Sequence, residues 1–127
     1  MKVILVTGSN RGIGKETIRQ LARVGHKTIL TGRNADHVRD AQDDLAAEGV
    51  ITDAFACDVR DEAQVRKLVQ YVDERYGKLD VVVNNAGIFL DGSDSTKADI
   101  DIIRQTFDTN VLGPYRMIEV LLPLLRK

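Results

Sequence analysis

Apolar residues in the first part of the chain alternate between short unbroken runs and helical repeats. The run from Val3 to Val6 is closed by Thr7-Gly8, and because it does not alternate with polar residues it predicts a strand buried on both faces. From Ile13 to Val24 apolar residues recur at helical spacing, and Gly25 follows where a left-handed C-terminal cap is expected. A strand followed by a helix is therefore the first predicted unit.

The same strand-and-helix unit recurs three more times. Further strands are expected at Thr28 to Thr31, Ile51 to Ala56 and Leu79 to Val83, and further helices at Ala35 to Glu48, Asp61 to Tyr76 and Ile100 to Leu125. Asp61 and Gln64 resemble a capping box, and Pro114 is expected to kink the last helix. No repeat, low-complexity tract or linker divides the sequence, so we expect residues 1–127 to form a single domain.

The alternation of four strands with four helices predicts the fold class. Short links between them favour an α/β fold, a doubly wound parallel sheet with helices on both faces, because right-handed crossovers leave few other topologies. The expected strand order is 3-2-1-4. In such a sheet a crevice opens at the carboxyl ends of strands 1 and 4, and that crevice is the expected binding site.

Composition narrows the range of partners. With 18 basic and 19 acidic side chains the chain has no excess of positive charge, so nucleic acid is not an expected partner. The single cysteine, Cys57, cannot form an internal disulfide, and Met1-Lys2 leads into a short apolar stretch without an export signal or a membrane span. We therefore expect a cytoplasmic protein that has no membrane partner.

A glycine-rich segment from Thr7 to Gly14, T-G-S-N-R-G-I-G, joins the first strand to the first helix. Backbone N–H groups and the positive helix end can receive a pyrophosphate there. Gly8 would permit the sharp turn, Gly12 would let the backbone approach a phosphate, and Gly14 would let the helix pack closely. The alternative is a turn that only needs positive φ, and the flanking strand and helix disfavour it.

This segment resembles the cofactor turn of the short-chain dehydrogenase/reductase family. Cys57-Asp58-Val59 is similar to the family's adenine-contacting aspartate motif, and Asn84-Asn85-Ala86-Gly87 resembles its N-N-A-G motif. Asn110 matches the helix asparagine of the family's catalytic set. Thr31-Gly32-Arg33 and the ending from Leu121 to Leu125 are similar to carbonyl-reductase-like members. The resemblance covers the whole chain and implies a Rossmann-like fold that binds a nicotinamide dinucleotide.

The motifs and the expected crevice together give a set of candidate site residues. Asn110 is the candidate from the catalytic set, and the candidate cofactor-binding residues are Gly8, Ser9, Asn10, Arg11, Gly12, Ile13, Gly14, Arg33, Asn34, Asp58, Val59, Asn85, Ala86 and Gly87. Some of them have a structural alternative, since Asp58 could cap the turn after its strand, and Asn84 and Asn85 could satisfy backbone groups.

The residues after the second strand predict which dinucleotide binds. Proteins that bind NAD usually carry an acidic side chain at this position, which hydrogen-bonds the ribose 2′-hydroxyl and repels a 2′-phosphate. This chain has Arg33-Asn34 instead, and Arg11 supplies a second cation from the glycine turn. Asp36 is more easily interpreted as a first-turn helix residue. We expect NADP(H) to be preferred over NAD(H), the alternative being two solvated surface arginines.

The resemblance implies that reduction of a carbonyl would need a tyrosine, a lysine four residues later and a serine. The residues four positions after Tyr71, Tyr76 and Tyr115 are arginine, aspartate and glutamate, and the serines Ser9, Ser93 and Ser95 lie in the turn and the loop after the fourth strand. We therefore expect binding without turnover. A missing C-terminal segment or a partner chain could complete a carbonyl or alcohol oxidoreductase, and an NADPH-sensing or scaffold protein is the second alternative.

The sequence also carries information on metal binding and on self-association. His26 and His37 are isolated, and the acidic residues from Asp91 to Asp101 lack regular ligand spacing, so no metal site is expected. The fourth strand, Leu79 to Val83, would be an apolar edge, and the last helix is apolar near its end. We expect a homo-oligomer formed through that strand, that helix or both.

Overall fold

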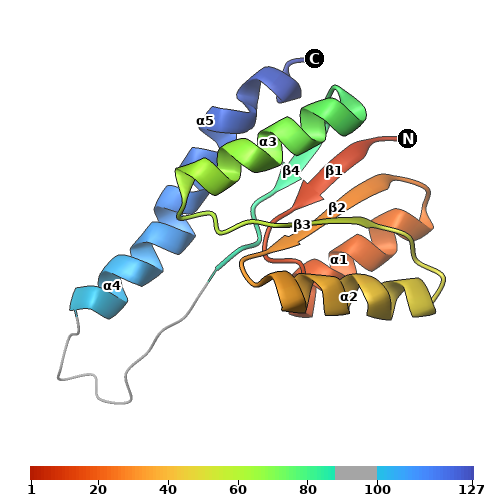
Figure 1. Ribbon diagram of the computed structural model, residues 1–127, viewed down its shortest axis with the longest axis horizontal. Helices are drawn as coiled ribbons and strands as arrows, with labels where there is room; N and C mark the ends of the chain where they lie inside the picture. Colours follow the sequence, from red (N-terminus) through yellow and green to blue (C-terminus); the bar gives the residue numbers. More distant parts are fainter. Residues whose placement is uncertain (88–99) are drawn as a thin grey trace.

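The structure is a computed structural model that describes residues 1–87 and 100–127. Its sheet is parallel and has the order β3-β2-β1-β4 (Figure 1). The strands are β1 (Val3–Val6), β2 (Lys27–Gly32), β3 (Asp53–Ala56) and β4 (Val81–Val83). The predicted strand order is therefore confirmed.

The helices cover both faces of this sheet (Figure 1). One face carries α1 (Gly12–Arg23) and α2 (Ala35–Ala47), and the other carries α3 (Glu62–Tyr76) and α5 (Gly113–Leu125). Alternate residues of β1 enter two separate hydrophobic clusters: Val3 and Leu5 pack with α3 and α5, whereas Ile4 and Val6 pack with α1 and α2. This explains why β1 is apolar at every position.

Helix ends follow the sequence signals in most places. Gly25, Gly49 and Gly77 have φ of +97°, +80° and +69°, which is the left-handed conformation that helix C-termini need. Asp61 caps α3, because its Oδ1 accepts from the backbone N–H groups of Ala63 and Gln64 at 3.0 and 3.4 Å. The predicted capping box is only half formed.

The Gln64 side chain makes a different contact from the one that a capping box requires. The Asp61 N–H donates to the carbonyl of Asp58 at 3.0 Å, so it has no need of a side-chain acceptor. Gln64 Oε1 instead accepts from the N–H of Asp58 at 2.9 Å. Gln64 therefore fixes the main chain just after β3, which was not predicted.

Two of the predicted strands begin two residues later in the structure, and one of them is β4, which begins at Val81 rather than Leu79. β3 begins at Asp53 rather than Ile51, because its ladder with β2 starts at the pair Ile29 and Asp53 and Ile51 is 79% exposed. Ile13, a predicted cofactor-binding residue, is 81% exposed, whereas Ile18 in the same helical repeat is buried. Ile13 occupies the first turn of α1 and lines a pocket instead of packing on the sheet.

The last helical region was predicted as one helix kinked at Pro114, and the structure differs. It consists of α4 (Ile100–Phe107), a π-helical segment η1 (Asp108–Leu112) and α5. The Gly113 N–H donates to the carbonyl of Asp108, five residues back. Pro114 lies in the first turn of α5, where a proline is tolerated, so the irregularity precedes the proline. No helix among the described residues is long and apolar enough to span a bilayer.

Candidate functional site

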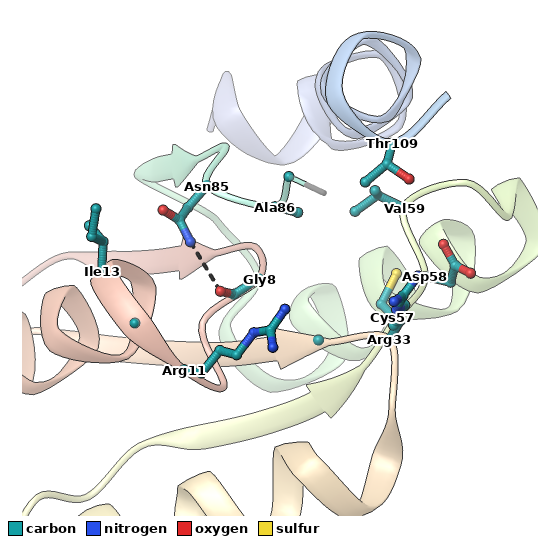
Figure 2. A pocket seen from close by; sticks show the side chains of 13 residues that line it. Gly8, Arg11, Ile13, Arg33, Cys57, Asp58, Val59, Asn85, Ala86 and Thr109 are labelled. Carbon is teal, nitrogen blue, oxygen red and sulfur yellow. Dashed lines mark hydrogen bonds between the residues drawn. The ribbon is translucent and has the colours of Figure 1, made fainter. Parts of the chain in front are cut away.

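A cavity of about 350 Å³ opens where the carboxyl ends of the strands meet (Figure 2). Such a volume is within the range of small-molecule sites. Its walls come from the ends of all four strands, from the start of α1 and from η1. The lining residues are Gly8, Arg11, Gly12, Ile13, Gly32, Arg33, Cys57, Asp58, Val59, Asn85, Ala86, Gly87 and Thr109. The structure thus brings ten of the predicted site residues together in one pocket.

The glycine turn has the backbone that its sequence predicts. Gly8 has a φ of +59°, and a Cβ on it would lie 2.7 Å from Ala86 Cα. A Cβ on Gly14 would lie 2.5 Å from Asn85 Nδ2 and 2.7 Å from the Gly8 carbonyl oxygen. Close packing at Gly14 is thus confirmed, although the neighbours are the turn and Asn85 rather than the sheet. Gly12 has a φ of +60° and open space around it.

Hydrogen bonds tie the end of β1 to the loop after β4. Thr7 Oγ1 accepts from the backbone N–H groups of Asn85 and Ala86 at 3.0 and 2.9 Å. Asn85 Nδ2 donates to the Gly8 carbonyl at 3.0 Å, a bond that Figure 2 shows. Thr7, which belongs to the glycine-rich segment but was not among the predicted site residues, therefore joins two walls of the pocket.

The far wall of the pocket is formed by Cys57, Asp58 and Val59 after β3, with Thr109 of η1 beside them (Figure 2). Burial raises the pKa of the Cys57 thiol to about 12, with Asp58 and Asp61 adding to the effect, so the thiol is uncharged at neutral pH. Hydrogen bonds from Arg60 hold the pKa of Asp58 below its ordinary value. The wall thus combines a neutral thiol with a carboxylate.

Two arginines line the pocket near the ends of β1 and β2. Arg11 belongs to the glycine turn and Arg33 follows Gly32, and both side chains are exposed (Figure 2). None of the ion pairs within residues 1–87 and 100–127 involves either arginine. Both guanidinium groups can therefore engage an anion in the pocket without first breaking an ion pair there.

Four predicted cofactor-binding residues do not line the cavity. Ser9 is fully buried, and its hydroxyl donates to the Val6 carbonyl at 2.7 Å and accepts from the Thr31 N–H at 2.9 Å. Asn34 caps α2, because its Oδ1 accepts from the His37 N–H at 3.0 Å. The other two, Asn10 and Gly14, pack against Gly32 and Asn85 respectively. These residues shape the loops that carry the pocket.

Asn110 lies in η1 next to Thr109 and is not among the lining residues. Its Oδ1 would be 3.5 Å from a Cβ built on Gly87, so it lies beside the loop after β4. Tyr115 is 72% exposed on α5. Ser93 and Ser95 fall outside the described residues, as do most of the acidic residues from Asp91 to Asp101. Within the described ranges no three histidine, cysteine or acidic side chains gather closely enough to hold a metal.

The strand order and the glycine turn at the start of α1 define a Rossmann-like nucleotide-binding fold. The chain belongs to the short chain dehydrogenase family, whose model matches residues 2–127. The family resemblance of the sequence is thereby confirmed.

Relatives agree with this assignment. The (+)-neomenthol dehydrogenase of Arabidopsis thaliana is 36% identical over 96% of this chain and 48% of its own length. Carbonyl reductase (NADPH) 1 of Macaca fascicularis is 37% identical over 99% of this chain and 46% of its own length. A Pseudomonas aeruginosa RhlG/NADP active-site complex matches with a TM-score of 0.89 at 33% identity, covering 98% of this chain and 48% of that one. The chain spans about half the length of the curated relatives it matches.

Proposed function

We propose that residues 1–127 form one dinucleotide-binding domain of an NADP(H)-dependent short-chain oxidoreductase. The observation that carries the proposal is the pocket at the strand ends, with the glycine turn on one side and two arginines beside it. Backbone N–H groups at the start of α1 suit a pyrophosphate. The nicotinamide is a carrier of hydride that would react only in a complete active site, and this chain's own residues would hold the dinucleotide in place.

The preference for NADP(H) over NAD(H) rests on Arg11 and Arg33. A 2′-phosphate carries about −1.5 to −2 charges near neutral pH, and arginine presents a planar fork that can bind it through two hydrogen bonds. One relative is named as an NADPH carbonyl reductase and one matching structure is titled as an NADP complex. Both names support the same cofactor for this chain.

We expect these 127 residues to bind the dinucleotide without transferring a hydride. The family's tyrosine and lysine pair has no counterpart in the sequence, since no tyrosine is followed four positions later by lysine. Asn110 beside Gly87 is the candidate from the catalytic set, and by itself it supplies no proton. The experiment is calorimetric titration with NADPH, NADH and adenosine 2′,5′-bisphosphate, alongside a carbonyl-reduction assay. Binding without NADPH consumption is expected, and robust turnover would refute this expectation.

A complete oxidoreductase is the second candidate function. The half-length match to enzymes such as the neomenthol dehydrogenase favours it, because a further segment or partner chain could supply the serine, tyrosine and lysine. An open reading frame that continues beyond Lys127 and encodes this serine, tyrosine and lysine would support the complete oxidoreductase. A non-catalytic NADPH sensor or scaffold is less favoured, since all the glycines of the cofactor turn are present.

Self-association is also part of the proposal. β4 has one neighbour, β1, in the described sheet, and a series of apolar side chains is exposed along the last helical region. They are Ile100, Ile103, Phe107, Val111, Leu112, Tyr115, Ile118 and Leu122. Light scattering of the unmodified protein is expected to show a homodimer, and Ile118→Glu is expected to weaken it. A clean monomer of the unmodified protein at high micromolar concentration would contradict the prediction. Cytoplasmic localisation stays a prediction from composition.

A further inference from the structure

One arginine of α5 joins two segments that form the far wall of the pocket. Arg116 Nη1 donates to the Val59 carbonyl at 3.2 Å, and Arg116 Nη2 pairs with Asp108 Oδ1 at 2.5 Å. The Arg116 side chain is 26% exposed and that of Asp108 is 35% exposed, so solvent reaches only part of the pair. Two nitrogens of one planar guanidinium therefore hold the loop after β3 against the first residue of η1.

Both of these segments contribute residues to the pocket, whereas Arg116 does not. Val59 and Thr109, the residue after Asp108, line the cavity (Figure 2). Arg116 and Asp108 instead line a second cavity, of about 430 Å³, which is formed by residues of α4, η1 and α5. Arg116 therefore supports the pocket wall from outside the pocket and need not touch a ligand.

The main chain at Val59 depends on this contact. Val59 lies between β3 and α3, outside any strand or helix, and among the described residues no donor other than Arg116 bonds to its carbonyl. Its side chain is 7% exposed, and a Cβ on Gly113 would lie 2.7 Å from Val59 Cγ2. Packing thus sets how closely α5 approaches the loop, and Arg116 sets the direction of the carbonyl. Without Arg116 this partly buried carbonyl would lack a partner, which favours a shift of the loop.

We propose that Arg116 is a positioning residue of the dinucleotide pocket, which holds Val59 and Thr109 at the distance from the glycine turn that a bound dinucleotide requires. The inference rests on the proposed function and adds a residue from outside the pocket to those that determine affinity. Asp108 orients the guanidinium, so Asp108 and Arg116 act as one unit.

The test measures the affinity of the full chain for NADPH by fluorescence titration. Arg116→Met removes both contacts and keeps a long side chain. It is expected to weaken NADPH about tenfold, because the wall loses a charge-assisted hydrogen bond and a carbonyl is left unpaired. Arg116→Lys can reach one of the two partners at a time, so it should give an intermediate loss. Urea denaturation gives the folded fraction of each variant, so that only folded proteins are compared.

Asp108→Asn separates positioning from charge. Removing a carboxylate makes the protein more positive, so electrostatics alone would strengthen the binding of an anionic dinucleotide. Positioning predicts the opposite, a loss of about threefold, because Arg116 loses the group that orients it. Asp108 also interacts with Arg60, so the double variant is needed. Asp108→Asn combined with Arg116→Met should bind NADPH no more weakly than Arg116→Met alone.

A spectroscopic readout locates the effect within the pocket. In ¹H–¹⁵N spectra of the unliganded protein, Arg116→Met should shift the amide signals of Val59 and Thr109. The signals of Gly12 and Gly14 in the glycine turn should stay in place, because that turn is tied to β4 and not to α5.

The matched control is Arg104→Met. Arg104 lines the same second cavity as Arg116, but it is exposed and is absent from the pocket lining. The variant removes the same charge and should leave NADPH affinity unchanged. Should Arg116→Met fail to fold by circular dichroism, Arg116→Lys and Asp108→Asn take its place, with weaker NADPH binding expected for both.

The outcomes separate this inference from the proposed function. An NADPH affinity that is unchanged in Arg116→Met would overturn the positioning role, even where the variant is less stable. An equal loss in Arg104→Met, tighter binding by Asp108→Asn, or amide shifts throughout the glycine turn would overturn it as well, while dinucleotide binding stands. If NADPH does not bind the unmodified protein, the proposed function itself fails and the inference fails with it.

Discussion

Replacing Arg33 with glutamine tests whether the pocket is built for a 2′-phosphate. Arg33 lies just after β2 and lines the pocket, and no ion pair within the described residues engages it. In water, two unit charges 4 Å apart interact by ~1 kcal/mol, so a phosphate with about two charges gains ~2 kcal/mol from this exposed arginine. With salt screening, we expect Arg33→Gln to weaken NADPH binding about 10- to 30-fold.

NADH provides the internal comparison because it lacks the 2′-phosphate. Arg33→Gln should change its affinity by less than about twofold, since an exposed charge far from the other phosphates contributes little. Adenosine 2′,5′-bisphosphate should lose affinity about as much as NADPH does. Raising the ionic strength should weaken NADPH more for the unmodified protein than for the variant.

The control variant is Arg39→Gln on α2. Arg39 is 68% exposed, pairs with Asp36 at 3.8 Å, and is absent from the pocket lining. It removes the same charge from the molecule, so any loss of NADPH affinity that it shares with Arg33→Gln is a long-range effect. The reasoning is refuted if Arg33→Gln weakens NADPH and NADH by the same factor, or if the unmodified protein binds NADH as tightly as NADPH.

Three further predictions concern stability. Gly14→Ala should lower the free energy of unfolding by ~1–3 kcal/mol in urea denaturation, because the added Cβ would lie 2.7 Å from a backbone oxygen of the turn. A loss below ~0.5 kcal/mol would contradict the close packing at Gly14. Leu121→Ala should lower the free energy of unfolding by ~2–5 kcal/mol, because Leu121 is fully buried. Leu122→Ala should lower it far less, because Leu122 is 36% exposed. Equal losses for the two variants would refute the packing of α5. Arg60 depresses the folded-state pKa of Asp58, so the pair stabilises the fold above the ordinary carboxyl pKa of about 4 and loses this effect as pH falls through the lower folded value. Arg60→Gln should therefore be less stable than the unmodified protein at pH 7, by an amount that shrinks on acidification in pH-dependent urea melts, and a constant difference would count against it.

Sequence patterns predicted the sheet because each strand depends on local signals. β1 is apolar throughout, which only a strand with two covered faces explains, and positive-φ glycines such as Gly25 and Gly77 mark the helix ends. Strand order then follows from handedness and short links. These signals are repeated along the chain, so an error of two residues at the start of β3 left the topology unchanged.

Details of the site were harder to predict because they depend on packing in three dimensions. Helical periodicity alone groups Ile13 with the core residue Ile18, and it was the glycine motif that placed Ile13 in the predicted site, where it lines the pocket. The glycine motif placed Ser9 near a ligand, while the fold turns its hydroxyl toward β2. Asp58 and Arg60 are two residues apart, yet their pairing depends on the turn after β3. No helical periodicity distinguishes η1 from its neighbours, and Thr109 was missed for that reason.

Thr109 places the C-terminal helical region in the same pocket as the glycine turn, on a different wall, although the two are about a hundred residues apart in the sequence. If contacts with Thr109 contribute to ligand binding, the ligand prefers the state in which α5 is docked on α3, and mass action then links occupancy to that docking. When the free ligand is at 100 times its Kd, binding stabilises the docked state by ~2.7 kcal/mol. Amide hydrogens of α5 around Leu121 should then exchange about a hundredfold more slowly, wherever exchange follows undocking of the helix. A nucleotide bound in this pocket would therefore act as a non-covalent cross-link between the two ends of the chain.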